Sequence, residues 1–291
     1  MHRITIFAVA FVLAAPAFAQ DDFTTQQTRL LEAARADLAA KPGDADALIW
    51  VGRRLGYLGR YEEAIKTYEM GERLHPADAR FARHIGHRLI SLRRFPEAEA
   101  AFERAVALTA ATPDATEPDG LPNDAGVPTS TLKGNIWYHL GLARYLQGNF
   151  AGAARAYEGA AALAHNPDAA AAARYWLYLS LTRAGDEKAA TAALAGVDAD
   201  WSLIENGVYF ELALCLRGER DCEALLEAAR DADGVVYATP AYGVAMARLI
   251  GGDAEGARAL LEEIAGRDVG AAFGRIAAEA DLARGIARKA D

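Results

Sequence analysis

Apolar and polar positions follow a helical period through most of the chain, and the pattern itself repeats. Residues 56–76, "GYLGRYEEAIKTYEMGERLHP", and residues 90–110, "ISLRRFPEAEAAFERAVALTA", share one skeleton at an offset of thirty-four residues. The matched positions are Leu58/Leu92, Arg60/Arg94, Tyr61/Phe95, Glu63/Glu97, Ala64/Ala98, Tyr68/Phe102 and Leu74/Leu108. A single helix pair buries too little surface, so repeats of this length indicate a stacked array in which neighbours build a shared core. The sequence therefore predicts an all-α fold of helix–turn–helix repeats.

The fullest copy of the pattern is residues 137–167, "WYHLGLARYLQGNFAGAARAYEGAAALAHNP". The residues in register there are Trp137, Leu140, Gly141, Gly148, Phe150, Ala153, Tyr157, Ala160 and Leu163. This pattern resembles the tetratricopeptide repeat family, which implies a right-handed superhelical solenoid with a concave groove. Small residues at Gly52, Gly86 and Gly141 would let helices approach closely. Aromatic side chains at Tyr68, Phe102 and Tyr157 would then fill the space between successive pairs.

The same pattern divides the chain after residue 19 into a series of hairpins. We expect a leading half repeat at 24–42 and a cap helix at 268–290 within a solenoid spanning 20–291. Between them we expect repeats at about 45–78, 79–110, 134–167, 171–198, 204–231 and 238–266. In the later copies Leu, Ala or charged residues replace the aromatic positions. The register of the fourth and fifth repeats therefore stays open.

Residues 111–134, "ATPDATEPDGLPNDAGVPTSTLKG", interrupt the rhythm between the second and third full repeats. The segment is rich in proline, glycine and acidic residues and has no helical period. One interpretation is a solvated loop. The other is a loop folded back over the groove, since structureless loops of more than about 15 residues inside a compact domain are often functional.

Residues 1–19, "MHRITIFAVAFVLAAPAFA", have the pattern of a cleaved secretory signal peptide: one arginine, an apolar run and Ala17-Phe18-Ala19 at the cleavage point. The apolar run is shorter than the roughly 20 residues of a spanning helix. We expect a periplasmic or secreted protein without stable membrane insertion. The formal charge of −9, about −10 after loss of Arg3, disfavours nucleic acid as a partner, because phosphate binding needs a basic excess.

The two cysteines, Cys215 and Cys222, lie on either side of a short predicted turn between two helices. In an oxidising compartment an even number of closely spaced cysteines favours a disulfide. The alternative is a pair of small buried apolar side chains.

Signals for catalysis are weak, because the chain has no nucleophile-elbow, zinc-protease or phosphate-loop motif. His84 and His87 lie three residues apart and are the best metal candidates, but no further ligands accompany them in the sequence. Polar contacts in the groove are the simpler interpretation. We therefore expect no enzyme activity, no catalytic residues, no metal and no cofactor.

The family resemblance implies which side chains line the groove, namely those of the first helix of each repeat that lie between packing positions. The binding candidates are Arg53, Arg80, Arg83, His87, Asn135, Tyr138, Tyr145 and Tyr175. Of these, Arg53, Arg83 and His87 are expected on the concave face and not in the core. Such a groove, basic at its N-terminal end and aromatic in the middle, suits an extended peptide with acidic residues at one end.

Two functions follow from this groove. The first is a non-enzymatic scaffold in the cell envelope that binds an extended protein or peptide partner. The alternative is an accessory glycan- or polymer-binding subunit of an envelope enzyme system, with Tyr138, Tyr145 and Tyr175 as stacking platforms.

Overall fold

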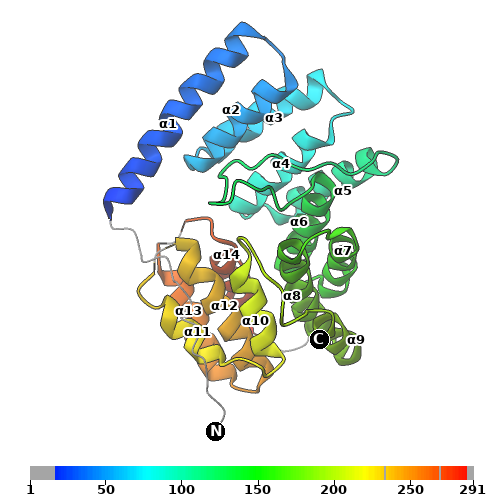
Figure 1. Ribbon diagram of the computed structural model, residues 1–291, viewed down its shortest axis with the longest axis vertical. Helices are drawn as coiled ribbons and strands as arrows, with labels where there is room; N and C mark the ends of the chain where they lie inside the picture. The colour runs from blue at the N-terminus through cyan, green and yellow to red at the C-terminus, as the bar shows by residue number, and fades with distance from the viewer. Residues whose placement is uncertain (1–16, 233, 269, 287–291) are drawn as a thin grey trace.

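The computed structural model describes residues 17–232, 234–268 and 270–286, and these form helices joined mostly by short turns, with longer connections at 110–131 and 196–206 (Figure 1). The helices are α1 (Ala17–Ala40), α2 (Ala45–Tyr57), α3 (Tyr61–Leu74), α4 (Ala79–Ser91), α5 (Phe95–Thr109), α6 (Leu132–Leu146), α7 (Phe150–Leu163), α8 (Pro167–Ala184), α9 (Glu187–Ala195), α10 (Gly207–Leu216), α11 (Cys222–Ala229), α12 (Gly234–Ile250), α13 (Ala254–Gly266) and α14 (Phe273–Arg284). Successive helices pack as antiparallel hairpins, and the hairpins stack into a curved array. The fold is the all-α solenoid of TPR-like repeats that the sequence predicts. The predicted signal peptide lies mostly outside the described residues, since α1 begins at Ala17.

Close helix approach occurs where the repeat pattern places glycine. A Cβ atom added to Gly52 would lie 2.3 Å from the ring of Tyr68, and one added to Gly86 would lie 2.7 Å from the ring of Phe102. Tyr68 and Phe102 are buried. The glycines allow the close approach that the sequence predicts, and each packs directly against the aromatic ring of its own hairpin.

The turn between α4 and α5 departs from its equivalents. Gly59, between α2 and α3, has φ 73°, whereas Arg93 occupies the matching position with φ 62°. A non-glycine residue in the left-handed region costs of the order of 1 kcal/mol. The Arg93 side chain bonds Glu279 of α14, with Nε 2.9 Å from Oε2. The strained turn thus holds a contact to a helix 186 residues further along the chain.

The array closes on itself. Helix α12 packs against both α10 and α14, and α14 also packs against α6 in the middle of the array (Figure 1). The hydroxyl groups of Tyr145 in α6 and Tyr242 in α12 lie 2.8 Å apart. Asp281 in α14 accepts bonds from Tyr242 (2.8 Å) and from Arg183 in α8. The inner surface of the middle repeats is therefore buried against the C-terminal helices.

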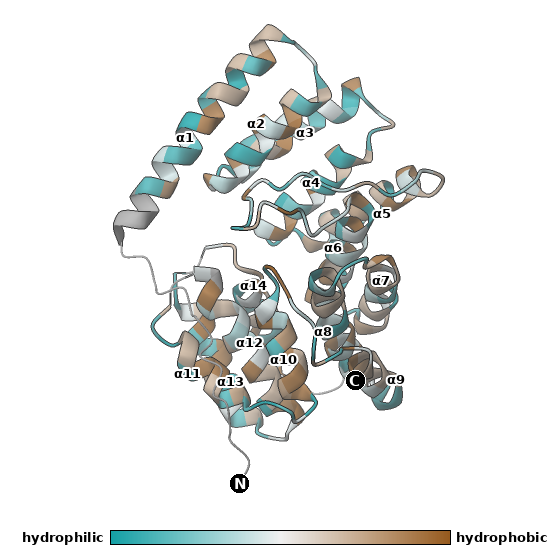
Figure 2. Ribbon diagram, viewed as in Figure 1, coloured by the Kyte–Doolittle hydropathy of each residue, from teal (hydrophilic) through white to brown (hydrophobic). Residues whose placement is uncertain are grey.

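This closure buries much of the apolar surface of the C-terminal helices. Hydrophobic residues colour much of α12, whereas α1 carries many hydrophilic ones (Figure 2). Within the described parts of the chain, no helix combines the length and apolar character needed to cross a bilayer.

The disulfide predicted from the sequence is present. Cys215 in the last turn of α10 and Cys222 at the start of α11 are joined, with Cα atoms 5.2 Å apart. Asp221 accepts a bond from the Glu223 amide and caps α11. The bond therefore fixes the angle between two short helices.

Candidate functional site

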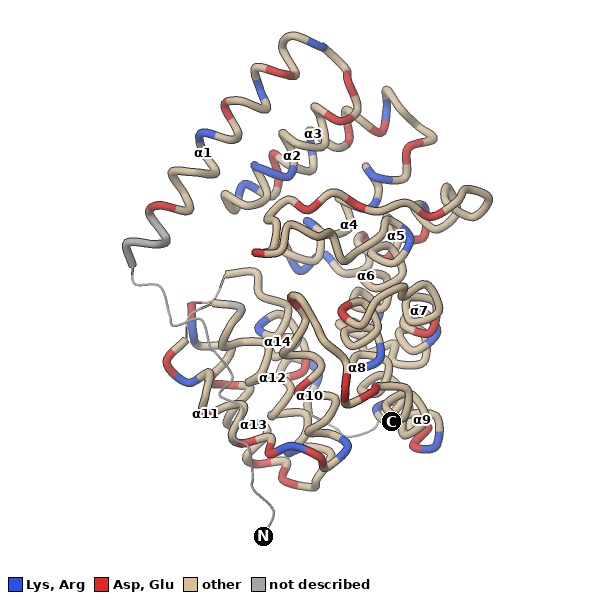
Figure 3. The backbone as a smooth tube through the Cα atoms, viewed as in Figure 1, with Lys and Arg blue, Asp and Glu red and all other residues tan. Residues whose placement is uncertain are grey.

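Residues 111–134, here called the insertion, fold back along the inner side of α2, α4 and α6. The ends of the insertion pair with each other: the Glu117 amide donates to the Ser130 carbonyl (3.0 Å), and the Leu132 amide donates to the Ala115 carbonyl (2.8 Å). These bonds close the base of the insertion, and Glu117, Gly120 and Thr129 within it are buried while most of its other residues are exposed. In Figure 3 acidic positions of the insertion run beside basic positions of α2 and α4.

The insertion covers a group of basic side chains, here called the basic cluster: Arg53, Arg83, His84, His87 and Arg88. Together with Tyr57 and Tyr68 they line a small cavity of about 100 Å³.

Main-chain carbonyls and one carboxylate of the insertion contact this cluster and its neighbour in α2. Arg53 Nη1 donates to the Pro118 carbonyl (2.7 Å), and Arg54 Nη1 donates to the Gly120 carbonyl (3.0 Å). The Glu117 carboxylate lies 3.1 Å from Arg83 Nε.

The histidines of the cluster are neutral. Arg83 Nη1 lies 3.1 Å from His84 Nδ1 and 3.4 Å from His87 Nδ1, and a guanidinium can only donate. Burial, reinforced by Arg83, lowers the pKa of His84 well below its usual value. Burial, reinforced by Arg88 and His139, does the same for the pKa of His87. Both rings therefore act as hydrogen-bond acceptors for Arg83.

We expected Arg83 on the concave face and not in the core, but its side chain is buried, with only 7% exposed. The reason is the insertion, whose Glu117 is itself buried and neutralises the guanidinium. Arg53 and His87 are half-buried on the same face. Arg80 does not join the cluster, because Asp46 and Asp78 hold its guanidinium, each at 2.6 Å, at the start of α4.

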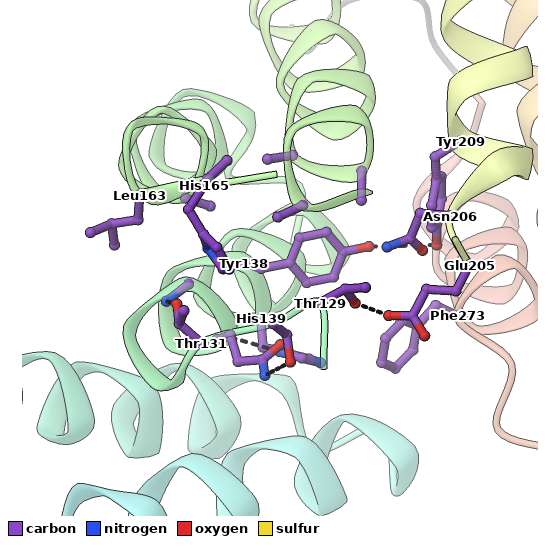
Figure 4. Close-up of a pocket in the computed structure, with 18 residues that line it drawn as sticks. Thr129, Thr131, Tyr138, His139, Leu163, His165, Glu205, Asn206, Tyr209 and Phe273 are labelled. Atoms are coloured by element: carbon purple, nitrogen blue, oxygen red, sulfur yellow. Dashed lines mark hydrogen bonds between the residues drawn. The ribbon is translucent and has the colours of Figure 1, made fainter. Parts of the chain in front are cut away.

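A second hollow, here called the aromatic cavity, lies beside the insertion where α6, α8, α10 and α14 meet (Figure 4). Its volume is about 370 Å³. Its lining includes Thr129, Asn135, Tyr138, His139, Leu163, His165, Glu205, Asn206, Tyr209 and Phe273. The two hollows adjoin through His139, whose ring centroid lies 4.7 Å from that of His87 and 5.7 Å from that of Phe273.

Of the three tyrosines expected in the groove, only one lies at the aromatic cavity. Tyr138 lines the cavity, and its hydroxyl lies 3.5 Å from that of Tyr209. Tyr145 and Tyr175 are 0% and 1% exposed, because the closed array packs over them. They cannot stack on a sugar in a groove, which removes two of the three proposed glycan platforms.

Asn135 lies between the two hollows, as a lining residue and as a partner of the insertion. Its Nδ2 donates to Glu117 (2.8 Å) and to the Ser130 hydroxyl (3.0 Å).

Sequence reasoning missed the acidic and C-terminal parts of the site. Glu205 precedes α10 and accepts bonds from Thr129 and from Asn123 Nδ2 (3.2 Å) of the insertion. Phe273 opens α14 and reaches the cavity only because the array closes. Only the acidic composition of the insertion pointed to Glu117. The described residues contain no group of three or more His, Cys, Asp or Glu side chains placed to hold a metal ion.

No protein-family model and no curated protein sequence matches the chain. Among solved structures, it is similar to the crystal structure of MamA, with 17% identity, 62% of this chain and 92% of that chain covered, and a TM-score of 0.45. It is also similar to YrrB, described as a TPR protein with an unusual peptide-binding site, with 16% identity, coverage of 87% and 99%, and a TM-score of 0.46. With identities this low and TM-scores below one half, these similarities add nothing to what the helix hairpins already show.

Proposed function

We propose that the protein is a non-enzymatic scaffold that binds an extended, acidic segment of a partner protein along the inner face of its first repeats. The observation that carries the proposal is the docking of the insertion on the basic cluster. An extended stretch of polypeptide already lies there, held by arginine bonds to its carbonyls at Pro118 and Gly120 and by a carboxylate at Glu117. These are the contacts by which a groove recognises main chain and acidic side chains.

The charge balance of the cluster supports the same chemistry. Glu117 lies within ion-pair distance of Arg83, whereas Arg88 has no carboxylate at that distance among the described residues. Its guanidinium lies 5.7 Å from the centre of the Tyr61 ring. The inner face therefore holds more positive charge than the insertion neutralises. A partner with further acidic groups would compete with the insertion for this face.

Binding in trans tests the proposal. In one variant, residues 114–130 are replaced by a Gly/Ser linker of equal length, which keeps the chain connected and removes Glu117. The probe is a fluorescein-labelled peptide with the sequence of residues 113–131, "PDATEPDGLPNDAGVPTST". Fluorescence anisotropy should show binding to the linker variant and at least tenfold weaker binding to the intact protein, whose site is occupied.

A matched peptide with Glu117→Gln is the control for charge recognition and should bind the linker variant at least fivefold more weakly. Thermal melting of the linker variant checks that it folds. A cooperatively folded variant that binds neither peptide would refute the proposal.

We place this scaffold in the periplasm or the secretion medium. The support is the leader-like sequence of residues 1–19 together with the disulfide, which persists in oxidising compartments. Intact mass of exported protein should correspond to a chain that starts at Gln20. A mass that includes residues 1–19 in exported material would contradict this location signal.

A further inference from the structure

The aromatic cavity has a different chemistry from the basic cluster beside it. Its walls carry the rings of Tyr138, Tyr209 and Phe273, which come from three helices that meet only because the array closes (Figure 4). Leu163 and several alanines complete an apolar lining. Its volume of about 370 Å³ falls within the range of small-ligand pockets, about 300–1,000 Å³.

The polar groups that line the cavity include two clear acceptors. His139 Nδ1 lies 2.7 Å from the Asn135 carbonyl, so this nitrogen carries the proton. Burial, reinforced by Arg83, lowers the pKa of His139 to about 3, and the ring is neutral at pH 7. Its Nε2 therefore keeps a free lone pair and makes no hydrogen bond to another described residue.

The second acceptor is the carboxylate of Glu205 at the rim. It accepts one bond from Thr129 and one from Asn123, and a carboxylate can accept about four. Burial raises the pKa of Glu205, and the nearby carboxyls of Asp119 and Asp168 raise it further. The raised pKa reflects the lack of a cation beside this carboxyl group, and an organic cation placed there would stabilise its charged form.

No lysine or arginine is among the lining residues of the cavity. The guanidinium of Arg83, which acts on His139 at the edge of the cavity, is already neutralised by Glu117. Faces of aromatic rings attract organic cations, and carboxylate and imidazole acceptors complete their hydrogen bonds.

From this geometry we propose that the aromatic cavity binds an organic cation, an ammonium or guanidinium group on an aliphatic arm. The arm lies along Tyr138, Tyr209 and Phe273, and the charged group meets Glu205 at the rim. The insertion supplies Thr129 to the lining of the cavity, so the tests use the intact protein, and small probes need no protein partner.

The probes are n-butylammonium and n-butylguanidinium, with n-butanol as the neutral match and butyrate as the anionic match. Isothermal titration or saturation-transfer NMR should show at least tenfold tighter binding of the two cations than of n-butanol or butyrate. N-acetyl-lysine methylamide tests the source of the cation. Tighter binding of this probe than of n-butylammonium indicates a side chain on a partner, and equal or weaker binding indicates a free amine.

Glu205→Gln should weaken binding of the cations at least fivefold and leave n-butanol binding unchanged. Glu211→Gln is the matched control, since Glu211 lies on α10 with Tyr209 but pairs with Arg220 outside the cavity (3.4 Å). Tyr209→Leu should also weaken cation binding, and thermal melting checks that each variant folds. Equal binding of cation, alcohol and anion, or an unchanged affinity in folded Glu205→Gln protein, overturns the proposal.

Discussion

The carboxylate of Asp281 joins the last helix to the middle of the array, and its replacement by asparagine should strongly destabilise the fold. Asp281 is 0% exposed and accepts bonds from Tyr242 (2.8 Å), from Arg183 and from Arg284 (Nη2, 2.6 Å). Arg284 keeps some access to water, but Arg183 is only 3% exposed. Asp281→Asn therefore removes the negative charge that pairs with a buried guanidinium.

The expected size follows from this burial. Removing one partner of a buried ion pair costs about 3–5 kcal/mol, because the remaining charge stays desolvated. Asparagine retains one oxygen acceptor for Tyr242, so we expect a loss near the lower end, about 3 kcal/mol. Replacing both Arg183 and Asp281 by leucine should cost less than Asp281→Asn, since no isolated charge is then buried.

Urea unfolding followed by far-UV circular dichroism at pH 7 measures these differences. Glu279→Gln is the control on the same helix: Glu279 is 29% exposed and pairs with Arg93 and Arg275, so its loss should cost about 0–1 kcal/mol. An Asp281→Asn protein no less stable than Glu279→Gln would show that Arg183 does not depend on this carboxylate. A double leucine variant less stable than Asp281→Asn would refute the same reasoning.

Three further outcomes are expected. Tyr145→Phe breaks buried hydrogen bonds and should cost about 1–2 kcal/mol, whereas Tyr175→Phe should be neutral or stabilising in the same urea assay, because the Tyr175 hydroxyl is buried with no partner among the described residues. Reducing the Cys215–Cys222 bond, or replacing both residues by serine, should lower the free energy of unfolding by about 2–3 kcal/mol, and thiol counting of denatured native protein should find no free thiol. His139, with its pKa lowered to about 3, stays neutral in the fold while the unfolded chain gains a proton below about pH 6.5. The contribution of neutral His139 to the free energy of unfolding is therefore fully present above about pH 6.5 and is lost as pH drops toward 3, with a loss of about 2 kcal/mol at pH 5. His139→Gln should reduce the difference in unfolding free energy between pH 7 and pH 5. An equal difference in the wild-type and variant proteins would contradict this.

The glycan alternative shows that a repeat pattern predicts which side of the array a side chain faces but not whether that side is open to a ligand. Tyr145 and Tyr175 occupy positions that face the inside of the array, as the pattern requires. They are buried because C-terminal helices fill that inside. Likewise, Arg83→Glu would not test surface charge alone, because it would place a second carboxylate beside the buried Glu117.

The sequence by itself predicted the helical hairpins, the close helix approach at Gly52 and Gly86, and the disulfide as the favoured state of the two cysteines. These features depend on residues near one another in the chain, through side-chain period, caps, turn residues and the spacing of two cysteines. Only the tertiary structure decided that the array closes and that the insertion occupies the basic cluster. Arg183 and Asp281 are 98 residues apart, and neither carries a local signal of the other. Which distant surfaces meet depends on the summed curvature of many repeats, and that sum decides which inner side chains stay open to a partner.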